Sequence, residues 1–266
     1  MNTELWHLTE GNSPLIATAI HDGHTVREEL KKIMLINEDE QLREEDPFTG
    51  ELTEVAETRL IGLRSRFEVD LNRPRERAVY IKPEDAWNLN IYKTPPSQEI
   101  INRSLEEYDL FYAEVSRLFS DFEKRFGRFV VFDIHTYCYR RGGPDGVEAD
   151  PDANPEVNIG TGPMDRDFWA PIVDRFITDM RAFNYSGSHL DVRENIKFKG
   201  GFFSKYTNEK FPNSACVLSI EFKKIFMDEW TGELFKDKFE LLKEVLRTAV
   251  PGVLKELEKL NKKDNN

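Results

Sequence analysis

Two short apolar runs in this sequence each lead into a histidine-bearing segment. Residues 14–20 (PLIATAI) run into the tetrapeptide HDGH at residues 21–24, and residues 128–134 (RFVVFDI) run into His135. Short apolar runs that are rich in β-branched or aromatic residues are typical of buried strands. We therefore expect both runs to be strands that carry polar chemistry at their carboxyl ends.

Helical patterns lie between these strands. Further strands are expected at residues 65–71, 157–159 and 216–220, and helices at residues 25–34, 97–126, 168–183 and 233–260. Gly127 is expected to end the long second helix, and Pro251 to interrupt the last one. Alternating strands and helices predict an α/β sandwich, in which ligands bind beyond the carboxyl ends of the strands. Because no repeat or linker divides the sequence, we expect one domain over residues 1–266.

The charge balance narrows the class of ligand. The chain carries 37 Lys and Arg against 49 Asp and Glu, a net charge of −12. This charge repels the phosphate backbone of nucleic acids and anionic membrane surfaces. A small acidic substrate is still compatible, because a few arginines in a pocket act within the Debye length of about 8–10 Å. We therefore expect a small-molecule substrate, with neither nucleic acid nor membrane as a partner.

Cysteine content and the N-terminal sequence predict a cytoplasmic protein. The two cysteines, Cys138 and Cys216, sit in strand-like apolar runs, where a thiol behaves as a small hydrophobic group. The N-terminal residues lack the basic and apolar regions of a signal peptide. No window of the sequence is long and apolar enough for a membrane-spanning helix.

Three of the five histidines fall in the two strand-end segments, namely His21, His24 and His135. A catalytic zinc site takes three nitrogen or oxygen ligands and keeps one position open for water. His21 and His24 are three residues apart across a strand-to-helix turn, a spacing that can direct both at one ion. Asp22 and Asp133 are candidates to orient the imidazole rings by accepting a hydrogen bond from the ring nitrogen that does not bind the metal.

Motifs at several places resemble the zinc carboxypeptidase superfamily. The segment IHDGH is similar to its strand-end HxxE motif, DIHTY to the strand of its third metal ligand, and SIEF to the strand of its catalytic glutamate. More closely, the ordered set HDG, EEDPF, VDLNR, DIHTY and KGGFFSKY resembles the N-formylglutamate amidohydrolase family over residues 14–225. The resemblance implies a three-layer α/β fold with a mixed central sheet flanked by helices, as in zinc carboxypeptidases. It also implies a Zn²⁺ or other divalent ion and hydrolysis of an N-acyl amino acid.

The second metal ligand, besides His21 and His135, has two candidates. His24 fits the last position of the superfamily's HxxE motif, whereas Asp46 in the EEDPF segment fits an acidic position that family members often carry. Many members read HSGR where this chain reads HDGH. Both residues are therefore candidates for the second ligand, and His24 is slightly preferred. The alternative interpretation of Asp46 is a solvated acidic loop beside Pro47.

Glu221 ends the apolar run at residues 216–220, where a carboxylate is costly to bury unless it faces a polar site. Beside a metal-activated water, such a carboxylate can take a proton and pass it to the leaving amine, which is the catalytic role that the SIEF resemblance implies. The alternative is a structural salt bridge with Lys223 or Lys224.

Arginines near the motifs are candidates for substrate binding. The DLNR match implies that Asn72 and Arg73 hold a substrate carboxylate, since an arginine fork makes two parallel charge-assisted hydrogen bonds. The alternative for Arg73 is an ion pair with Asp70 or Glu76.

Arg140 and Arg141, just after DIHTY, are candidates for a second clamp on a dicarboxylate, with a solvated loop as the alternative. Tyr137 is a candidate oxyanion donor or a packed aromatic residue. The glycine pair at residues 200–201 predicts close approach of backbone to a ligand, with a bulge or a tight turn as the alternative.

Together these features predict a metal-dependent amidohydrolase that cleaves an N-acyl acidic amino acid such as N-formylglutamate. One alternative keeps the metal and replaces the substrate by peptides or cell-wall fragments, as the superfamily's carboxypeptidases imply. The other is a module that binds N-acyl amino acids without turnover.

Overall fold

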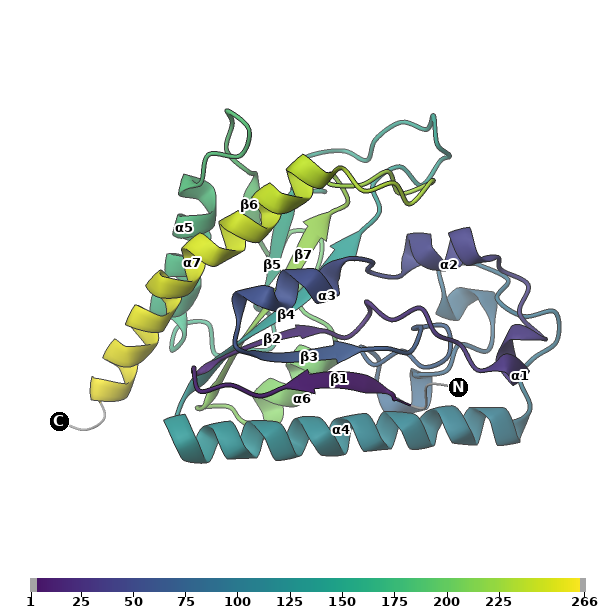
Figure 1. Cartoon of the computed structure of the whole chain (residues 1–266), viewed down its shortest axis with the longest axis horizontal. Coiled ribbons are helices and arrows are strands. Elements are labelled where there is room, and N and C mark those ends of the chain that lie inside the picture. The colour runs from purple at the N-terminus through teal and green to yellow at the C-terminus, as the bar shows by residue number, and fades with distance from the viewer. Residues whose placement is uncertain (1–3, 264–266) are drawn as a thin grey trace.

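The computed structural model describes residues 4–263, in which seven strands form one sheet (Figure 1). In sheet order the strands are β1 (Trp6–Thr9), β3 (Thr58–Gly62), β2 (Leu15–Ala19), β4 (Phe129–Tyr137), β7 (Ala215–Lys223), β5 (Val157–Gly160) and β6 (Val192–Glu194). The pairs β1–β3 and β5–β7 are antiparallel, and the other neighbouring pairs are parallel. The predicted mixed sheet is therefore confirmed. The predicted domain also includes residues 1–3 and 264–266, which lie outside the described residues.

Helices cover both faces of this sheet. They are α1 (Glu28–Lys31), α2 (Glu38–Glu44), α3 (Thr49–Leu52), α4 (Gln98–Phe126), α5 (Ala170–Ala182), α6 (Phe202–Lys210) and α7 (Lys236–Lys263), with 3-10 turns at Thr53–Val55, Arg75–Arg77 and Pro83–Asp85. Figure 1 shows α4 along one side of the sheet and α5 beside α7 on the other. Apolar residues of α4 and α6 share one core with the sheet, and those of α5 and α7 share a second. This layering is the predicted three-layer α/β sandwich. None of the helices within residues 4–263 combines the length and apolar character needed to cross a membrane.

Strand β4 is apolar over most of its length because both of its faces are covered. Phe129 and Val131 belong to the core on the α4 side, whereas Phe132 and Ile134 belong to the core on the α5–α7 side. Side chains two residues apart along a strand share a face. His135 therefore points to the α4 side of the sheet, as do Phe129 and Val131.

The long helix α4 matches the expectation from the sequence at both ends. The Ser97 side chain caps its first turn by accepting a hydrogen bond from the Ile100 N–H. Gly127 ends it with a φ of +73°, a conformation that costs a glycine little because it lacks a Cβ. The helix is thus positioned by its own sequence as well as by the core it covers.

The prediction of a strand at residues 65–71 is wrong. This segment is a turn, in which the Ser65 carbonyl accepts hydrogen bonds from the N–H groups of Glu68 and Val69. Its alternation of charged residues reflects buried ion pairs, since Glu68 pairs with Arg27 and Asp70 lies beside a neighbouring arginine. The strand of this region, β3, lies upstream at Thr58–Gly62.

Two predicted helix details also differ. Thr25 does not cap a helix, because its N–H donates to the Leu63 carbonyl and the helix shortens to Glu28–Lys31. Pro251 does not interrupt the last helix, which continues through it. The buried stripe of α7 that includes Ala249 and Val253 packs on α5, and this packing offsets the backbone hydrogen bond that proline cannot make.

Candidate metal centre

The parallel strands β2, β4 and β7 bring three candidate residues to one edge of the sheet. His21 follows β2, whereas His135 and Glu221 lie within the last three residues of β4 and β7 rather than after these strands. Asp46 arrives from the turn after α2, where its N–H donates to the His21 carbonyl at 3.0 Å. Segments far apart in the sequence therefore meet here.

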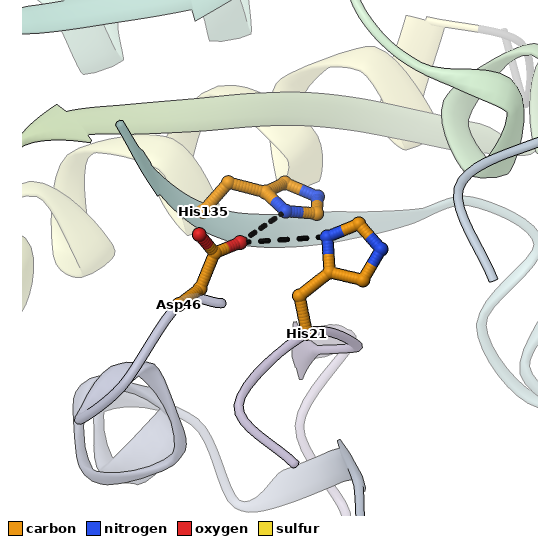
Figure 2. A group of neighbouring side chains, drawn as sticks. All are labelled: His21, Asp46 and His135. Atoms are coloured by element: carbon orange, nitrogen blue, oxygen red, sulfur yellow. Dashed lines mark hydrogen bonds and ion pairs between the residues drawn. The ribbon is translucent and has the colours of Figure 1, made fainter. Parts of the chain in front are cut away.

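His21, Asp46 and His135 form a buried group of possible metal ligands (Figure 2). One ligand atom of each residue lies within 4.8 Å of the others. Asp46 Oδ2 is 3.5 Å from His21 Nδ1 and 3.0 Å from His135 Nδ1. Figure 2 shows both rings turned toward this one carboxylate oxygen.

The other nitrogen of each imidazole faces a buried aspartate. His21 Nε2 is 2.7 Å from Asp70 Oδ1, and His135 Nε2 is 3.2 Å from Asp133 Oδ2. Asp133 also accepts a hydrogen bond from the Thr18 hydroxyl at 2.9 Å. An aspartate that accepts the Nε2–H fixes the tautomer and leaves Nδ1 as the ligand atom, an arrangement typical of metal-binding histidines. Asp133 thus holds the position that the sequence predicted for it.

The charges of the group suit a cation. Burial opposes ionisation of Asp46, but the hydrogen bond from His135 and the nearby imidazole of His21 lower its pKa well below the usual range. Burial also opposes ionisation of Asp70, whose pKa is nevertheless lowered, chiefly by the positive charge of Arg66. Burial disfavours a charged His135, yet Asp133 and Asp46 raise the pKa of this imidazole well above its usual value.

The donor set fits a divalent ion of the zinc type. Two imidazole nitrogens and one carboxylate oxygen would make three protein ligands and leave a fourth position of a tetrahedral site open. Within residues 4–263, His21 Nδ1 is buried and makes no hydrogen bond of ordinary geometry, although it lies 3.5 Å from Asp46 Oδ2. A buried nitrogen without a well-formed hydrogen bond is rare in a protein interior, and a metal ion would satisfy it.

His24 lies apart from this group. Its side chain is 42% exposed, and its Nδ1 contacts Glu45 at 2.5 Å. It lines a separate cavity together with Arg27 and Arg64. Asp22 also points elsewhere, because its carboxylate accepts a hydrogen bond from the Gly50 N–H at 2.9 Å. The HDGH turn therefore directs only its first histidine at the cluster, and the predicted role of Asp22 behind an imidazole is wrong.

A cavity of about 370 Å³ opens onto the cluster. Seven basic residues contribute to its wall, namely Arg43, Arg66, Arg73, Arg141, Lys197, Lys199 and Lys224, against the acidic residues Glu44, Asp46 and Glu221. The local field is thus cationic although the whole chain carries a charge of −12. Such a pocket attracts a small anion over short distances.

Asn72 and Arg73 are both part of the cavity wall. Asn72 Oδ1 accepts a hydrogen bond from the Phe203 N–H at 3.0 Å, and its Nδ2 lies 3.5 Å from His135 Nε2. Arg73 is 31% exposed, and its Nε is 3.5 Å from Asp70 Oδ2. The ion pair between Arg73 and Asp70, which was the alternative to substrate binding, is therefore present. Arg73 is nevertheless part of the cavity wall.

The glycine pair brings backbone close to Asn72 rather than simply making a turn. A Cβ at Gly201 would lie 2.2 Å from Asn72 Oδ1, so a larger residue would displace this side chain. Gly201 is also part of the cavity wall. The structure thus shows a close approach of this backbone to Asn72, while its approach to a ligand stays a prediction.

Arg140 and Arg141 occupy different surroundings. Arg140 pairs with Asp228 at 3.1 Å and does not contribute to the cavity wall, so the structure does not support it as a substrate clamp. Arg141 does contribute to the wall, and it makes two hydrogen bonds with the Glu44 carboxylate at 3.0 and 2.9 Å. Tyr137 lines the cavity, but its hydroxyl donates to the Pro155 carbonyl and is not directed at a ligand.

Glu221 lines the same cavity, and the two lysines near it are engaged elsewhere. Lys223 Nζ lies over the Tyr139 ring at 5.7 Å, and Lys224 Nζ donates to backbone carbonyls. Burial raises the pKa of Glu221 to about 7, while the positive charge of His135 opposes the rise. A carboxyl group with this pKa takes up and releases a proton near neutral pH.

Arg66 and Trp87 are cavity residues that the sequence did not single out as a site. The Arg66 guanidinium donates to Asp70 Oδ2 at 3.1 Å and lies 4.8 Å from the centre of the Trp87 ring. The sequence feature that could have indicated Arg66 is its place in the alternating segment SRFEVDL, where it shares one side with Glu68 and Asp70. Trp87 follows a turn-rich stretch without any motif.

Comparisons with known proteins show the family of this chain. The sequence profile of the family described as N-formylglutamate amidohydrolase matches residues 13–227. The structure is similar to an N-formylglutamate amidohydrolase of Ralstonia eutropha JMP134, with 17% identity, a TM-score of 0.72, and coverage of 97% of this chain and 98% of that one. It is also similar to a gene product of Agrobacterium tumefaciens, with 16% identity, a TM-score of 0.66, and coverage of 94% and 95%.

Among curated proteins, none matches this sequence. The family profile covers most of the chain and includes the segments that supply His21, Asp46, His135 and Glu221. This chain belongs to the N-formylglutamate amidohydrolase family.

Proposed function

We propose that this member of the family is a metal-dependent amidohydrolase that cleaves the amide bond of an N-acyl acidic amino acid such as N-formylglutamate. The observation that carries the proposal is the convergence of His21 Nδ1, His135 Nδ1 and Asp46 Oδ2 in a buried group that opens onto a cationic cavity. In this proposal Asp46, rather than His24, is the third ligand, and the ion is Zn²⁺ or another divalent metal.

The chemistry divides between the ion and the side chains of the cavity. A divalent ion, when bound, supplies Lewis acidity that polarises the amide carbonyl and makes water a better nucleophile. Glu221 accepts the proton that the attacking water loses, and then donates it to the nitrogen of the leaving amine. Because the pKa of this carboxyl group is raised to about 7, it can both accept and donate a proton near neutral pH.

The substrate is held by the basic side of the cavity. Arg73 binds the carboxylate of the amino acid through its guanidinium fork, and Asn72 adds hydrogen-bond capacity beside it. Arg141, another basic residue of the wall, is available to a second carboxylate through the N–H groups that it does not use on Glu44. A cavity of about 370 Å³ suits an N-acyl amino acid better than an extended peptide.

Elemental analysis and substrate profiling of one preparation test the proposal. We expect one divalent ion per chain, hydrolysis of N-formylglutamate, and loss of hydrolysis after chelation that is restored by added zinc. A panel of N-formyl, N-acetyl and N-succinyl amino acids identifies the acyl group. Faster cleavage of peptides would favour a carboxypeptidase-like activity, and binding without turnover would favour a non-catalytic module. A metal-free protein that hydrolyses the panel equally well would refute metal dependence.

A further inference from the structure

The ammonium group of Lys224 is buried in an unusual way. Only 1% of Lys224 is exposed to solvent. Lysine is one of the residue types that are almost never fully buried without a partner. Its Nζ donates hydrogen bonds to the carbonyls of Arg43 and Glu45 at 2.6 and 2.7 Å. A cation placed here without a carboxylate needs a structural or functional reason, because desolvation of a charge is costly.

Both carbonyls belong to the end of α2. The last carbonyl groups of a helix have no partner within the helix and carry the negative end of its dipole, so a cation is favoured there. The carbonyl between them, that of Glu44, accepts a hydrogen bond from Arg66 Nη1 at 3.2 Å. Three successive carbonyls, of residues 43–45, are therefore held by two cations of the cavity wall.

Asp46 follows these three residues directly. Its N–H is fixed by the His21 carbonyl at 3.0 Å, and its Oδ1 accepts a hydrogen bond from the Thr136 hydroxyl at 2.9 Å. These contacts orient the carboxylate only if the preceding backbone stays in place. Lys224 is attached to the end of β7, where its own N–H donates to the Tyr137 carbonyl at 3.0 Å, so it ties the turn to the sheet that carries His135.

We propose that Lys224 is a positioning residue for the metal ligand Asp46: it holds the turn at residues 43–46 so that Asp46 Oδ2 meets His21 and His135. This inference rests on the proposed metal site. Lys224 acts through the backbone and does not contact the ion. Its substitution therefore lowers metal affinity without removing a ligand.

The test compares Lys224→Met with the wild-type protein and with Lys223→Met. Met keeps most of the aliphatic stem and removes the charge and the hydrogen bonds. Lys223 is the neighbouring lysine, lies over the Tyr139 ring, and is not part of the cavity wall. We expect Lys224→Met to bind Zn²⁺ about 10- to 100-fold more weakly, the usual effect of losing a group that supports a metal ligand. Lys223→Met is expected to bind Zn²⁺ with wild-type affinity.

Two further measurements separate positioning from a general loss of stability. Added Zn²⁺ restores much of the kcat/KM that Lys224→Met loses at limiting Zn²⁺, because no metal ligand has been removed, whereas the loss of a substrate contact would not respond to Zn²⁺. Amide hydrogen exchange at Glu45 and Asp46 becomes faster in the metal-free variant, whereas exchange in the core of β4 is unchanged. Destabilisation alone would instead lower the melting temperature and leave the zinc affinity of the folded fraction as in the wild type.

The outcomes are distinct. A folded Lys224→Met with wild-type zinc affinity and wild-type amide exchange overturns the inference. If Lys224→Met does not fold, Lys224→Gln decides, because its neutral and shorter side chain cannot hold both carbonyls; unchanged zinc affinity then overturns the inference. If the wild-type protein binds no Zn²⁺, the proposed function fails, while amide exchange in the metal-free protein still tests whether Lys224 holds the turn.

Discussion

His135 of β4 and Glu221 of β7 are directly paired residues on neighbouring parallel strands. Paired residues of adjacent strands carry their side chains on the same face of a sheet. Both side chains line the same cavity, and each influences the charge of the other: His135 lowers the pKa of Glu221, and Glu221 raises that of His135. The sheet thus fixes the proposed acid–base group relative to a proposed metal ligand.

Substitution of Glu221 separates turnover from metal binding. Glu221→Gln keeps the size of the side chain and removes its ability to accept a proton. We expect kcat to fall by about 10²- to 10⁴-fold, the usual contribution of general acid–base catalysis, with the zinc content unchanged. Steady-state kinetics and elemental analysis on the same preparation check this. A variant that retains more than a tenth of the wild-type kcat would contradict the role of Glu221.

Substitution of single histidines distinguishes the ligand sets. His21→Ala removes one of the three proposed ligands, so we expect the purified variant to lose stoichiometric zinc and, with it, activity. His24→Ala is the matched control three residues away, and it should keep both, since His24 contacts Glu45 and lies outside the cluster. Loss of zinc from His24→Ala would instead restore the ligand assignment that the sequence alone placed first.

The sequence predicted the strands of this site better than the loop that completes it. Residues 14–20 and 128–134 were recognisable as strands because burial on both faces requires continuous apolar runs. The parallel arrangement then brings His21 and His135 to one edge. The fold class and the two histidines of the cluster therefore followed from local patterns and the family resemblance.

The position of Asp46 depends on contacts that are not local. Its orientation requires the His21 carbonyl, the Thr136 hydroxyl and the ammonium of Lys224, which come from separate parts of the chain. Sequence spacing gives no information on such contacts, and the regular spacing of His21 and His24 suggested a nearer partner. Arg140 and Arg141 show the same limit, because adjacent residues of a loop point in different directions and spacing does not tell which one faces the cavity.

The arginines provide a paired test of substrate binding. Arg73→Ala removes a charge-assisted contact worth about 1.5–3 kcal/mol, so kcat/KM for N-formylglutamate should fall roughly 10- to 100-fold. Arg140→Ala should have little effect, because Arg140 pairs with Asp228 outside the cavity wall. N-formylated amino acid amides, which lack the α-carboxylate, should be poor substrates for the wild type and should lose little further with Arg73→Ala. An equal loss on acid and amide would contradict the clamp.

The stability of the metal-free protein should depend on pH through Glu221. Burial raises the pKa of its carboxyl group from 4.5 to about 7, so between these values the folded state binds more protons than the unfolded state. The free energy of unfolding therefore decreases as pH rises through this range, and the loss is complete above pH 7. Asp46 and Asp70, whose pKa values are lowered, titrate below this window.

Glu221→Gln removes this titration, since its side chain is neutral at every pH. As pH rises from 4.5 to 8, the variant should gain on the order of 3 kcal/mol of stability relative to the wild type, which corresponds to a carboxyl pKa that rises from 4.5 to about 7 on folding. Urea unfolding of both metal-free proteins at pH 4.5, 6 and 8 measures the difference, and groups present in both proteins largely cancel. A difference that is the same at all three pH values would show that Glu221 is not buried in its charged form. Added Zn²⁺ should reduce the difference at pH 8, because a nearby cation stabilises the ionised carboxylate.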